Sequence, residues 1–376
     1  MRILYGVVGE GMGHATRSHV VLEHLLGAGH EVRVVVSGRA HGFLVEALSG
    51  FLNVTVEEIH GLTLRYFENR LDKTQSLYEN LKNSPKAVRR NVRVYRKVAE
   101  DGFRPDLVIS DFESWAALYA LNHFLPVISV DNMQVINRCR HDDEIRGDKT
   151  LGFRLAKAAV KLKLPGAYHY LVSSFFFPQV RKKRTTLIPP ILRRRVLEAR
   201  REPGDHIVVY QRVVPVDVLA SQLKALPYRF RVYGAEREGR DGNVTLCAFS
   251  DRAFIEDLRT ARAVVAGAGF TLMSEAVSLK VPMLAIPIAA QYEQELNARY
   301  LARLGYGAWS NTLDTETLAE FLRRSDEFSH NLQAYPYRDN EVLYACLDEL
   351  LALAQAGAKR PKLLTAAAPG KWRPKR

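Results

Sequence analysis

Cysteine is scarce in this chain: among 376 residues there are three, Cys139, Cys247 and Cys346, and no two have metal-ligand spacing. Such usage is typical of a reducing compartment and argues against a disulfide framework and a zinc site. Long apolar runs are also missing, because the longest are strand-length, below the ~20 residues that a membrane span needs. The first residues include the charged Arg2 and Glu10 and do not form a secretory signal peptide. We therefore expect a cytoplasmic protein without a membrane-spanning segment.

No convincing cluster of metal-ligating residues occurs in the sequence. The run His141-Asp142-Asp143-Glu144 could in principle bind a cation, but it is more typical of a solvated, charged loop. We therefore expect neither a metal nor another cofactor.

Acidic residues are outnumbered, since 41 Asp and Glu stand against 54 Lys and Arg and give a formal net charge of +13. This balance favours an anionic partner, such as nucleic acid, an anionic membrane or the diphosphate of a substrate. Nucleic acid is disfavoured because no known binding motif occurs and aromatic residues do not interleave the basic groups. Residues 151–164 mix aliphatic side chains with Arg154, Lys157 and Lys161 at helical spacing. A basic amphipathic helix of this kind can lie in a membrane interface, although most such helices pack on a core.

Strands and helices alternate in two series, which predicts two α/β domains. The first domain is expected over residues 1–177 and the second over 206–339. The basic, proline-containing stretch 178–205 between them has the composition of a linker. A helix is expected at 340–356, with a return to the first domain as one option, followed by a disordered basic tail over 357–376.

The most informative stretch is a glycine-rich turn that follows the apolar strand 263–266 and precedes a helix. The turn and the start of the helix comprise Gly267, Gly269, Phe270, Thr271 and Leu272. Such a turn lets backbone N–H groups approach an anion at the helix N-terminus, where the dipole favours negative charge. Glu275 follows on the same helix, and Glu293-Gln294 open another helix after the strand 283–286. A diphosphate, a ribose and a sugar would each find a partner here.

A second glycine-rich loop, Gly9-Glu10-Gly11-Met12-Gly13-His14, follows the N-terminal strand and precedes a helix expected from about Thr16 to Leu26. The dinucleotide fingerprint G-x-G-x-x-G fails at its last position, where His14 stands. The next strand ends without an acid for a ribose, but Arg39 would suit a phosphorylated ribose, so an NADP site stays open. His14 could also simply cap the helix.

Asp111 ends the strand 106–111, and it and His14 are both expected at carboxyl ends of strands, where ligands bind in open α/β sheets. A carboxylate bonded to an imidazole fixes its tautomer and stabilises the imidazolium. The alternative for Asp111 is to cap the helix 115–122. Asp131-Asn132 end another strand, where they could line an acceptor cleft, although a turn role is favoured.

The late stretch resembles the nucleotide-sugar signature of GT-B glycosyltransferases, the superfamily of the family 1 enzymes and the peptidoglycan GlcNAc transferase. The resemblance implies that Gly269 holds the diphosphate, Glu275 the ribose, and Glu293 and Gln294 the donor sugar. Gly267 stands where many family 1 members have a His, which leaves the diphosphate to backbone N–H groups and the helix dipole.

The N-terminal loop, with Gly11 and Gly13, is similar to the first loop of GT-B acceptor domains. In those domains the His is the usual base candidate, so the resemblance implies that His14, paired with Asp111, deprotonates an acceptor hydroxyl.

The fold that the resemblance implies is α/β of the GT-B type, with two Rossmann-like, doubly wound parallel-sheet domains facing a central cleft. The implied activity is inverting, metal-independent transfer of a sugar from a nucleoside diphosphate, UDP by default, to a hydroxyl acceptor, including a lipid-linked or cell-envelope glycan. Residues 154–163 predict peripheral contact with the inner face of an anionic cytoplasmic membrane. Two alternatives stay open: a nucleotide-sugar 2-epimerase, and a non-catalytic protein that binds a nucleotide sugar or a polyanion.

Overall fold

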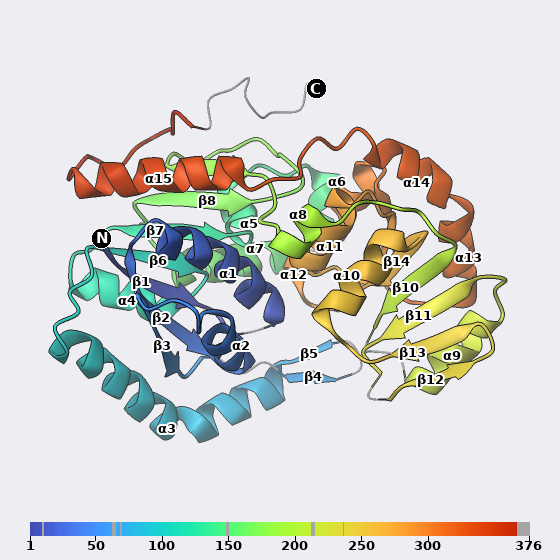
Figure 1. The fold of residues 1–376 in the computed structure, drawn as a ribbon, viewed down its shortest axis with the longest axis horizontal. Helices are drawn as coiled ribbons and strands as arrows, with labels where there is room; N and C mark the ends of the chain where they lie inside the picture. Colours follow the sequence, from blue (N-terminus) through green and yellow to red (C-terminus); the bar gives the residue numbers. More distant parts are fainter. Residues whose placement is uncertain are drawn as a thin grey trace.

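Two seven-stranded sheets, one from each half of the chain, organise the structure (Figure 1). The computed structural model describes residues 1–9, 11–61, 65–67, 70–147, 150–211, 215–235 and 237–366. The two halves lie side by side along the long axis of the molecule, and helices flank both sheets. A separate hairpin is formed by β4 (Arg65–Phe67) and β5 (Arg70–Asp72). The predicted α/β class with two doubly wound domains is confirmed.

The first sheet is parallel throughout and has the order β3-β2-β1-β6-β7-β8-β9. Its strands are β1 (Arg2–Val7), β2 (Glu31–Ser37), β3 (Val54–Ile59), β6 (Leu107–Asp111), β7 (Val127–Asp131), β8 (His169–Ser173) and β9 (Thr185–Ile188). The strand order reverses at β1, which pairs with β2 on one side and β6 on the other. Val7 is in register with Asp111, so the carboxyl ends of β1 and β6 adjoin. Ligands of open α/β sheets bind beyond strand ends at such a reversal.

Helices cover both faces of this sheet. The helices between β1 and β8 are α1 (Met12–Gly27), α2 (Arg39–Ala47), α3 (Lys73–Glu100), α4 (Ser114–Asn122), α5 (Gln134–Arg138), α6 (Asp143–Arg146) and α7 (Thr150–Lys163). One face is buried under α1 and α2, where Leu22 and Leu44 enter the core, and the other under α3 and α4, where Val98 and Tyr119 do. Helix α15 (Glu341–Gln355) packs on the first face through Leu347 and its neighbours.

The second sheet has the order β12-β13-β11-β10-β14-β15-β16, with β12 antiparallel at its edge. Its strands are β10 (His206–Tyr210), β11 (Arg229–Tyr233), β12 (Gly239–Asp241), β13 (Val244–Cys247), β14 (Ala263–Ala266), β15 (Met283–Ala285) and β16 (Gly307–Trp309). Its helices are α9 (Val216–Lys224), α10 (Asp251–Thr260), α11 (Phe270–Ser278), α12 (Tyr292–Arg303), α13 (Thr315–Arg323) and α14 (Ser325–Leu332). The order reverses between β10 and β14, and α11 follows β14, so the start of α11 lies at the switch point of this sheet.

The stretch that composition assigns to a linker, 178–205, contains two regular elements. Strand β9 is the edge strand of the first sheet, and its four residues are all buried. The short helix α8 (Arg194–Glu198) then leads to the second sheet. The first sheet therefore extends eleven residues beyond the predicted boundary at 177, to Ile188, because a buried edge strand follows the basic residues.

Residues 357–366 also differ from the predicted disordered tail, because they lie against the first domain. The carbonyl of Ala358 accepts a hydrogen bond from the hydroxyl of Tyr168, and Leu364 is buried. The backbone N–H of Thr365 donates to Glu349 on α15. Residues 367–376 of the predicted tail lie outside the described residues.

Aromatic side chains pack the two halves against each other. Phe176, after β8, stacks on Tyr300 of α12 with 3.9 Å between ring centroids. Phe175 lies next to Phe270 at the start of α11. These residues belong to one buried cluster that draws on both halves, which holds the site between the sheets in a defined geometry.

Candidate active site

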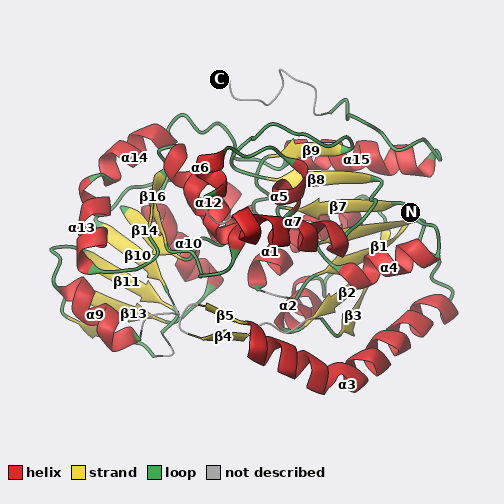
Figure 2. Ribbon diagram, turned by 180° about the vertical axis from the view of Figure 1, so that it is seen from behind, coloured by secondary structure: helices red, strands yellow, loops and turns green. Residues whose placement is uncertain are grey.

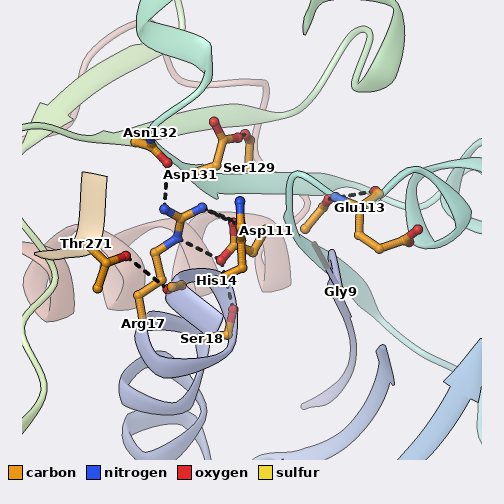
Figure 3. Close-up of polar contacts among 12 residues, drawn as sticks. Gly9, His14, Arg17, Ser18, Asp111, Glu113, Ser129, Asp131, Asn132 and Thr271 are labelled. Atoms are coloured by element: carbon orange, nitrogen blue, oxygen red, sulfur yellow. Dashed lines mark hydrogen bonds and ion pairs between the residues drawn. The ribbon is translucent and has the colours of Figure 1, made fainter. Parts of the chain in front are cut away.

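His14 lies on the first turn of α1, because that helix begins at Met12 rather than near Thr16 as expected. Gly11 precedes the helix with φ +84°, a conformation that favours glycine and ends the loop sharply. Glu10 of the same loop lies outside the described residues. The imidazole of His14 is 18% exposed, and its Nδ1 lies 2.9 Å from Oδ1 of Asp111. The two candidate catalytic residues are thus in contact, as Figure 3 shows.

Asp111 is fully buried and is held by side chains of α1 (Figure 3). Arg17 donates from Nε to Oδ2 at 2.8 Å and from Nη2 to Oδ1 at 2.5 Å, and Ser18 Oγ donates to Oδ2 at 2.9 Å. Burial alone would raise the pKa of Asp111, but Arg17 and His14 hold it well below the usual range of a carboxyl. Asp111 is therefore anionic at neutral pH.

The capping role considered for Asp111 belongs to Glu113 instead. The carboxylate of Glu113 accepts from the backbone N–H groups of Trp115 and Ala116 at 2.9 and 2.7 Å, in the first turn of α4. This cap leaves Asp111 free of the helix and directed at α1.

Arg17 was not among the predicted site residues, yet it contacts three of them: His14, Asp111 and Asn132. Its side chain is 4% exposed, and Nη1 donates to Asn132 Oδ1 at 2.6 Å. Nη2 also lies 2.6 Å from Nδ1 of His14. Burial lowers the pKa of His14, Arg17 lowers it further, and Asp111 opposes both. The signal in the sequence was the spacing, because a residue three positions after His14 lies on the same face of a helix.

Of the two acceptor-side residues at the end of β7, only Asn132 lies in the site. Its Nδ2 donates to Glu293 Oε1 at 2.9 Å, and Asn297 Nδ2 donates to the same oxygen at 2.6 Å. This bridge joins the first half of the molecule to α12 of the second. Asp131 is fully buried and makes a turn, accepting from Ser129 Oγ and from the backbone N–H of Gln134.

The glycine-rich turn with Gly267 and Gly269 leads from β14 into α11, whose start faces α1. Thr271 Oγ1 donates to the carbonyl of Gly13 at 3.2 Å (Figure 3). A Cβ added at Gly13 would lie 2.5 Å from that hydroxyl, so glycine permits this close approach. The first N–H groups of a helix have no partner within the helix and favour an anion. The start of α11 therefore combines anion-binding chemistry with direct contact to the helix of His14.

The remaining residues predicted for the donor side have partners within the protein itself. Glu275 is 2% exposed, and Arg193 donates to its two oxygens at 2.7 and 2.8 Å. Gln294 accepts from the backbone N–H of Ile288 and so fixes the loop before α12. The side chain of Phe270 is buried in the cluster between the halves, and Leu272 packs at its edge.

Metal ligation finds no support in the part of the chain that the structure describes, where no group of three or more His, Cys, Asp and Glu side chains could hold an ion. In the run after Arg140, both ring nitrogens of His141 have partners, the hydroxyl of Tyr300 and the carbonyl of Val135. Asp142 pairs with Arg303 of α12. These partners make the run a structural link between the halves.

Comparison with known proteins shows the family. The family model described as glycosyl transferase family 1 matches residues 1–325. The chain belongs to this family. It is a glycosyltransferase with the GT-B fold.

Proteins that are similar in sequence are named as glycosyltransferases. An uncharacterized glycosyltransferase of Methanosarcina acetivorans is 25% identical over 369 residues, which covers 86% of this chain and 89% of the relative. A UDP-N-acetylglucosamine–N-acetylmuramyl-(pentapeptide) pyrophosphoryl-undecaprenol N-acetylglucosamine transferase 3 of Bacillus cereus is 24% identical over 234 residues, which covers 54% of this chain and 64% of that enzyme.

Solved structures of low sequence identity share the fold of this glycosyltransferase. A UDP-glucosyltransferase from Polygonum tinctorium superposes with a TM-score of 0.67 at 14% identity, covering 94% of this chain and 98% of that one. The glycosyltransferase of kitacinnamycin superposes with a TM-score of 0.62 at 17% identity, covering 89% and 93%.

Proposed function

We propose that this glycosyltransferase moves a sugar from a UDP donor to an acceptor hydroxyl with inversion at the anomeric carbon. The observation that carries the proposal is the contact between α1 and α11. It brings a His–Asp pair to the start of a helix suited to bind a diphosphate. In this proposal the base and the leaving-group site act on opposite sides of the reacting sugar.

The reaction begins with His14 in the tautomer whose Nδ1–H donates to Asp111 and whose Nε2 carries a lone pair. Nε2 takes the proton of the acceptor hydroxyl, and the acceptor oxygen forms a bond to the anomeric carbon. The bond from that carbon to the diphosphate oxygen breaks, and the electron pair leaves with the diphosphate. Asp111 stabilises the imidazolium, and the N–H groups and dipole of α11 stabilise the diphosphate without a metal ion.

Donor recognition rests on three side chains. Glu275 is assigned to the ribose, where the nucleotide would take over or share the carboxylate that Arg193 now holds. Glu293 and Gln294 are assigned to the sugar. Asn132 and Asn297 both donate to one oxygen of Glu293, so a sugar hydroxyl would bind this carboxylate in competition with them.

A membrane-bound acceptor fits the exposed face of α7, which crosses the first half in Figure 2. Leu151, Leu155 and Leu162 on this helix are 68%, 60% and 77% exposed, and their spacing puts them on one side. Arg154 and Lys161 are exposed on the same helix. On an anionic lipid surface, exposed leucines can enter the apolar layer below the headgroups while neighbouring cations contact the negative headgroups. We assign the acceptor to a lipid-linked glycan at the inner face of the cytoplasmic membrane. No helix in the described residues is long and apolar enough to cross a bilayer.

The catalytic proposal is tested first by thermal shift against a panel of nucleotides and nucleotide sugars. A ligand at a hundredfold excess over its dissociation constant stabilises the folded state by ~2.7 kcal/mol. UDP and UDP-sugars should raise the melting temperature, and NMR of the transfer product should show the inverted anomer. Retention of configuration, or isomerisation of the donor without any acceptor, would contradict the proposal.

The membrane proposal is tested by sedimentation with vesicles of graded phosphatidylserine content at low salt. Wild-type protein should sediment, and Arg154→Glu/Lys161→Glu should stay in the supernatant. The control Arg240→Glu/Arg323→Glu makes the same charge change on the second half and should sediment like the wild type. Wild-type protein that stays in the supernatant would rule out the lipid surface.

A further inference from the structure

Nδ1 of His14 has two neighbours that require different protonation states of this nitrogen. Oδ1 of Asp111, at 2.9 Å, can only accept a hydrogen bond while it is ionised. Nη2 of Arg17, at 2.6 Å, can only donate one. A ring nitrogen carries either a proton or a lone pair, so Nδ1 serves one neighbour at a time. The shorter distance is the one to Arg17.

We propose that Arg17 is a positioning residue that keeps His14 in the Nε2–H tautomer, in which it is not a base, until the donor sugar engages Glu293. Nη2 of Arg17 has two hydrogens, and the geometry gives one to Asp111 Oδ1 and the other to His14 Nδ1. The proton of the neutral ring is then on Nε2, the nitrogen that must be free to accept the proton of the acceptor. This inference rests on the proposed function of His14.

The switch to the active tautomer needs no net change in protons or electrons. Nε2 releases its proton to water, Nδ1 takes a proton from water, and the new Nδ1–H donates a hydrogen bond to Asp111. The imidazole is 18% exposed, so water reaches it. Asp111 keeps Ser18 and the Nε of Arg17 as donors throughout, so its charge stays compensated.

The link to the donor runs through Asn132. Nη1 of Arg17 donates to Asn132, which in turn donates to Glu293 on α12. Arg17 is 4% exposed and therefore moves with its partners rather than into solvent. A sugar hydroxyl that binds Glu293 competes with Asn132 for the carboxylate, and a shift of Asn132 draws the guanidinium away from Nδ1. The base would then form only when a donor is in place.

The tautomer can be measured directly by two-bond ¹H–¹⁵N NMR of protein labelled with ¹⁵N-histidine. The chain has 11 histidines, and the signals of His14 are those lost in His14→Gln. The pKa of His14 is lowered by burial and by the nearby cations Arg17 and Lys163, and Asp111 opposes them, so at pH 7.5 the ring is neutral. Wild-type protein without donor should show a protonated Nε2 and an unprotonated Nδ1. A protonated Nδ1 in this spectrum would overturn the proposal without any variant.

Two variants separate geometry from charge. Arg17→Lys keeps a cation beside Asp111 but replaces the planar guanidinium with a single nitrogen on a shorter side chain. One ammonium cannot serve Asp111, Asn132 and Nδ1 of His14 together as the three guanidinium nitrogens do, so the proton should move to Nδ1. Ser18→Ala removes a donor from the same carboxylate without touching His14, and the tautomer should stay as in the wild type. A tautomer unchanged in Arg17→Lys would refute the role of the guanidinium. The spectra are recorded without donor or acceptor, so they test the tautomer of His14 separately from the transfer reaction. Either proposal can therefore be refuted while the other stands.

Discussion

Asp131 should make the stability of the fold depend on pH, because its carboxyl is fully buried at the end of β7. Burial raises its pKa from 3.8 to about 6, against the hydrogen bonds from Ser129 and Gln134, and the nearby charge of Asp111 adds to the rise. The folded state thus binds this proton more tightly than the unfolded state does. The stabilisation is complete below pH 3.8 and is lost as the pH rises through about 6. A shift of about 2 units corresponds to about 3 kcal/mol.

The variant Asp131→Asn removes this pH dependence while keeping the turn. Its Oδ1 can accept from the N–H of Gln134, and its Nδ2 can donate to Ser129 Oγ. Urea denaturation should find the variant more stable than the wild type by up to about 3 kcal/mol at pH 8, with roughly a third of that difference left at pH 4.5. Asp217→Asn, at an exposed carboxyl on α9, removes the same charge and is the control. An equal difference between Asp131→Asn and the wild type at both pH values would refute the reasoning.

Three further predictions concern donor binding and the contact between the halves. Glu275→Ala should weaken UDP binding by about 1.5–3 kcal/mol. The variant should also lower folding stability by about 3 kcal/mol, which is the low end for a broken buried ion pair. The low end applies because Arg193 keeps Asp251 as a partner. Unchanged UDP affinity in calorimetry would remove Glu275 from the ribose role. Gln294→Ala should weaken UDP-glucose but not UDP, and equal weakening of both would contradict its sugar role. Gly13→Ala should slow transfer because its Cβ would crowd the hydroxyl of Thr271, and a Thr271→Ala background should relieve the loss. A Gly13→Ala enzyme with wild-type turnover would show that the close approach is not needed.

The secondary structure was predicted correctly where apolar strands alternate with helices of regular hydrophobic periodicity. The strand expected at 263–266 coincides with β14, because buried parallel strands are almost continuously apolar. Strand β9 was not predicted because it has only four residues and lies between arginines, lysines and prolines. The composition of the whole stretch hides so short a strand. The start of α1 was placed too late because glycines disfavour a helix, whereas here Gly11 ends the loop and Gly13 is already helical.

The site was readable only in part, because its residues come from distant segments. The pairing of His14 with Asp111 followed from the expected position of both at strand ends, and the register of β1 and β6 brings them together. Arg17 was not found, because an arginine on a helix is usually exposed and nothing local reveals that its partners are Asp111 and Asn132. The same holds for Arg193, whose pairing with Glu275 joins residues 82 positions apart.

The most direct test of the account is the transfer rate of His14→Ala measured together with its affinity for UDP. The substrate is the UDP-sugar selected by the thermal-shift screen, and UDP release is followed with and without acceptor. The account predicts a ~10²–10⁴-fold loss of acceptor-dependent turnover, the usual contribution of a general base, with UDP affinity by calorimetry nearly unchanged. Wild-type turnover by a folded His14→Ala protein would contradict the central claim that this imidazole deprotonates the acceptor.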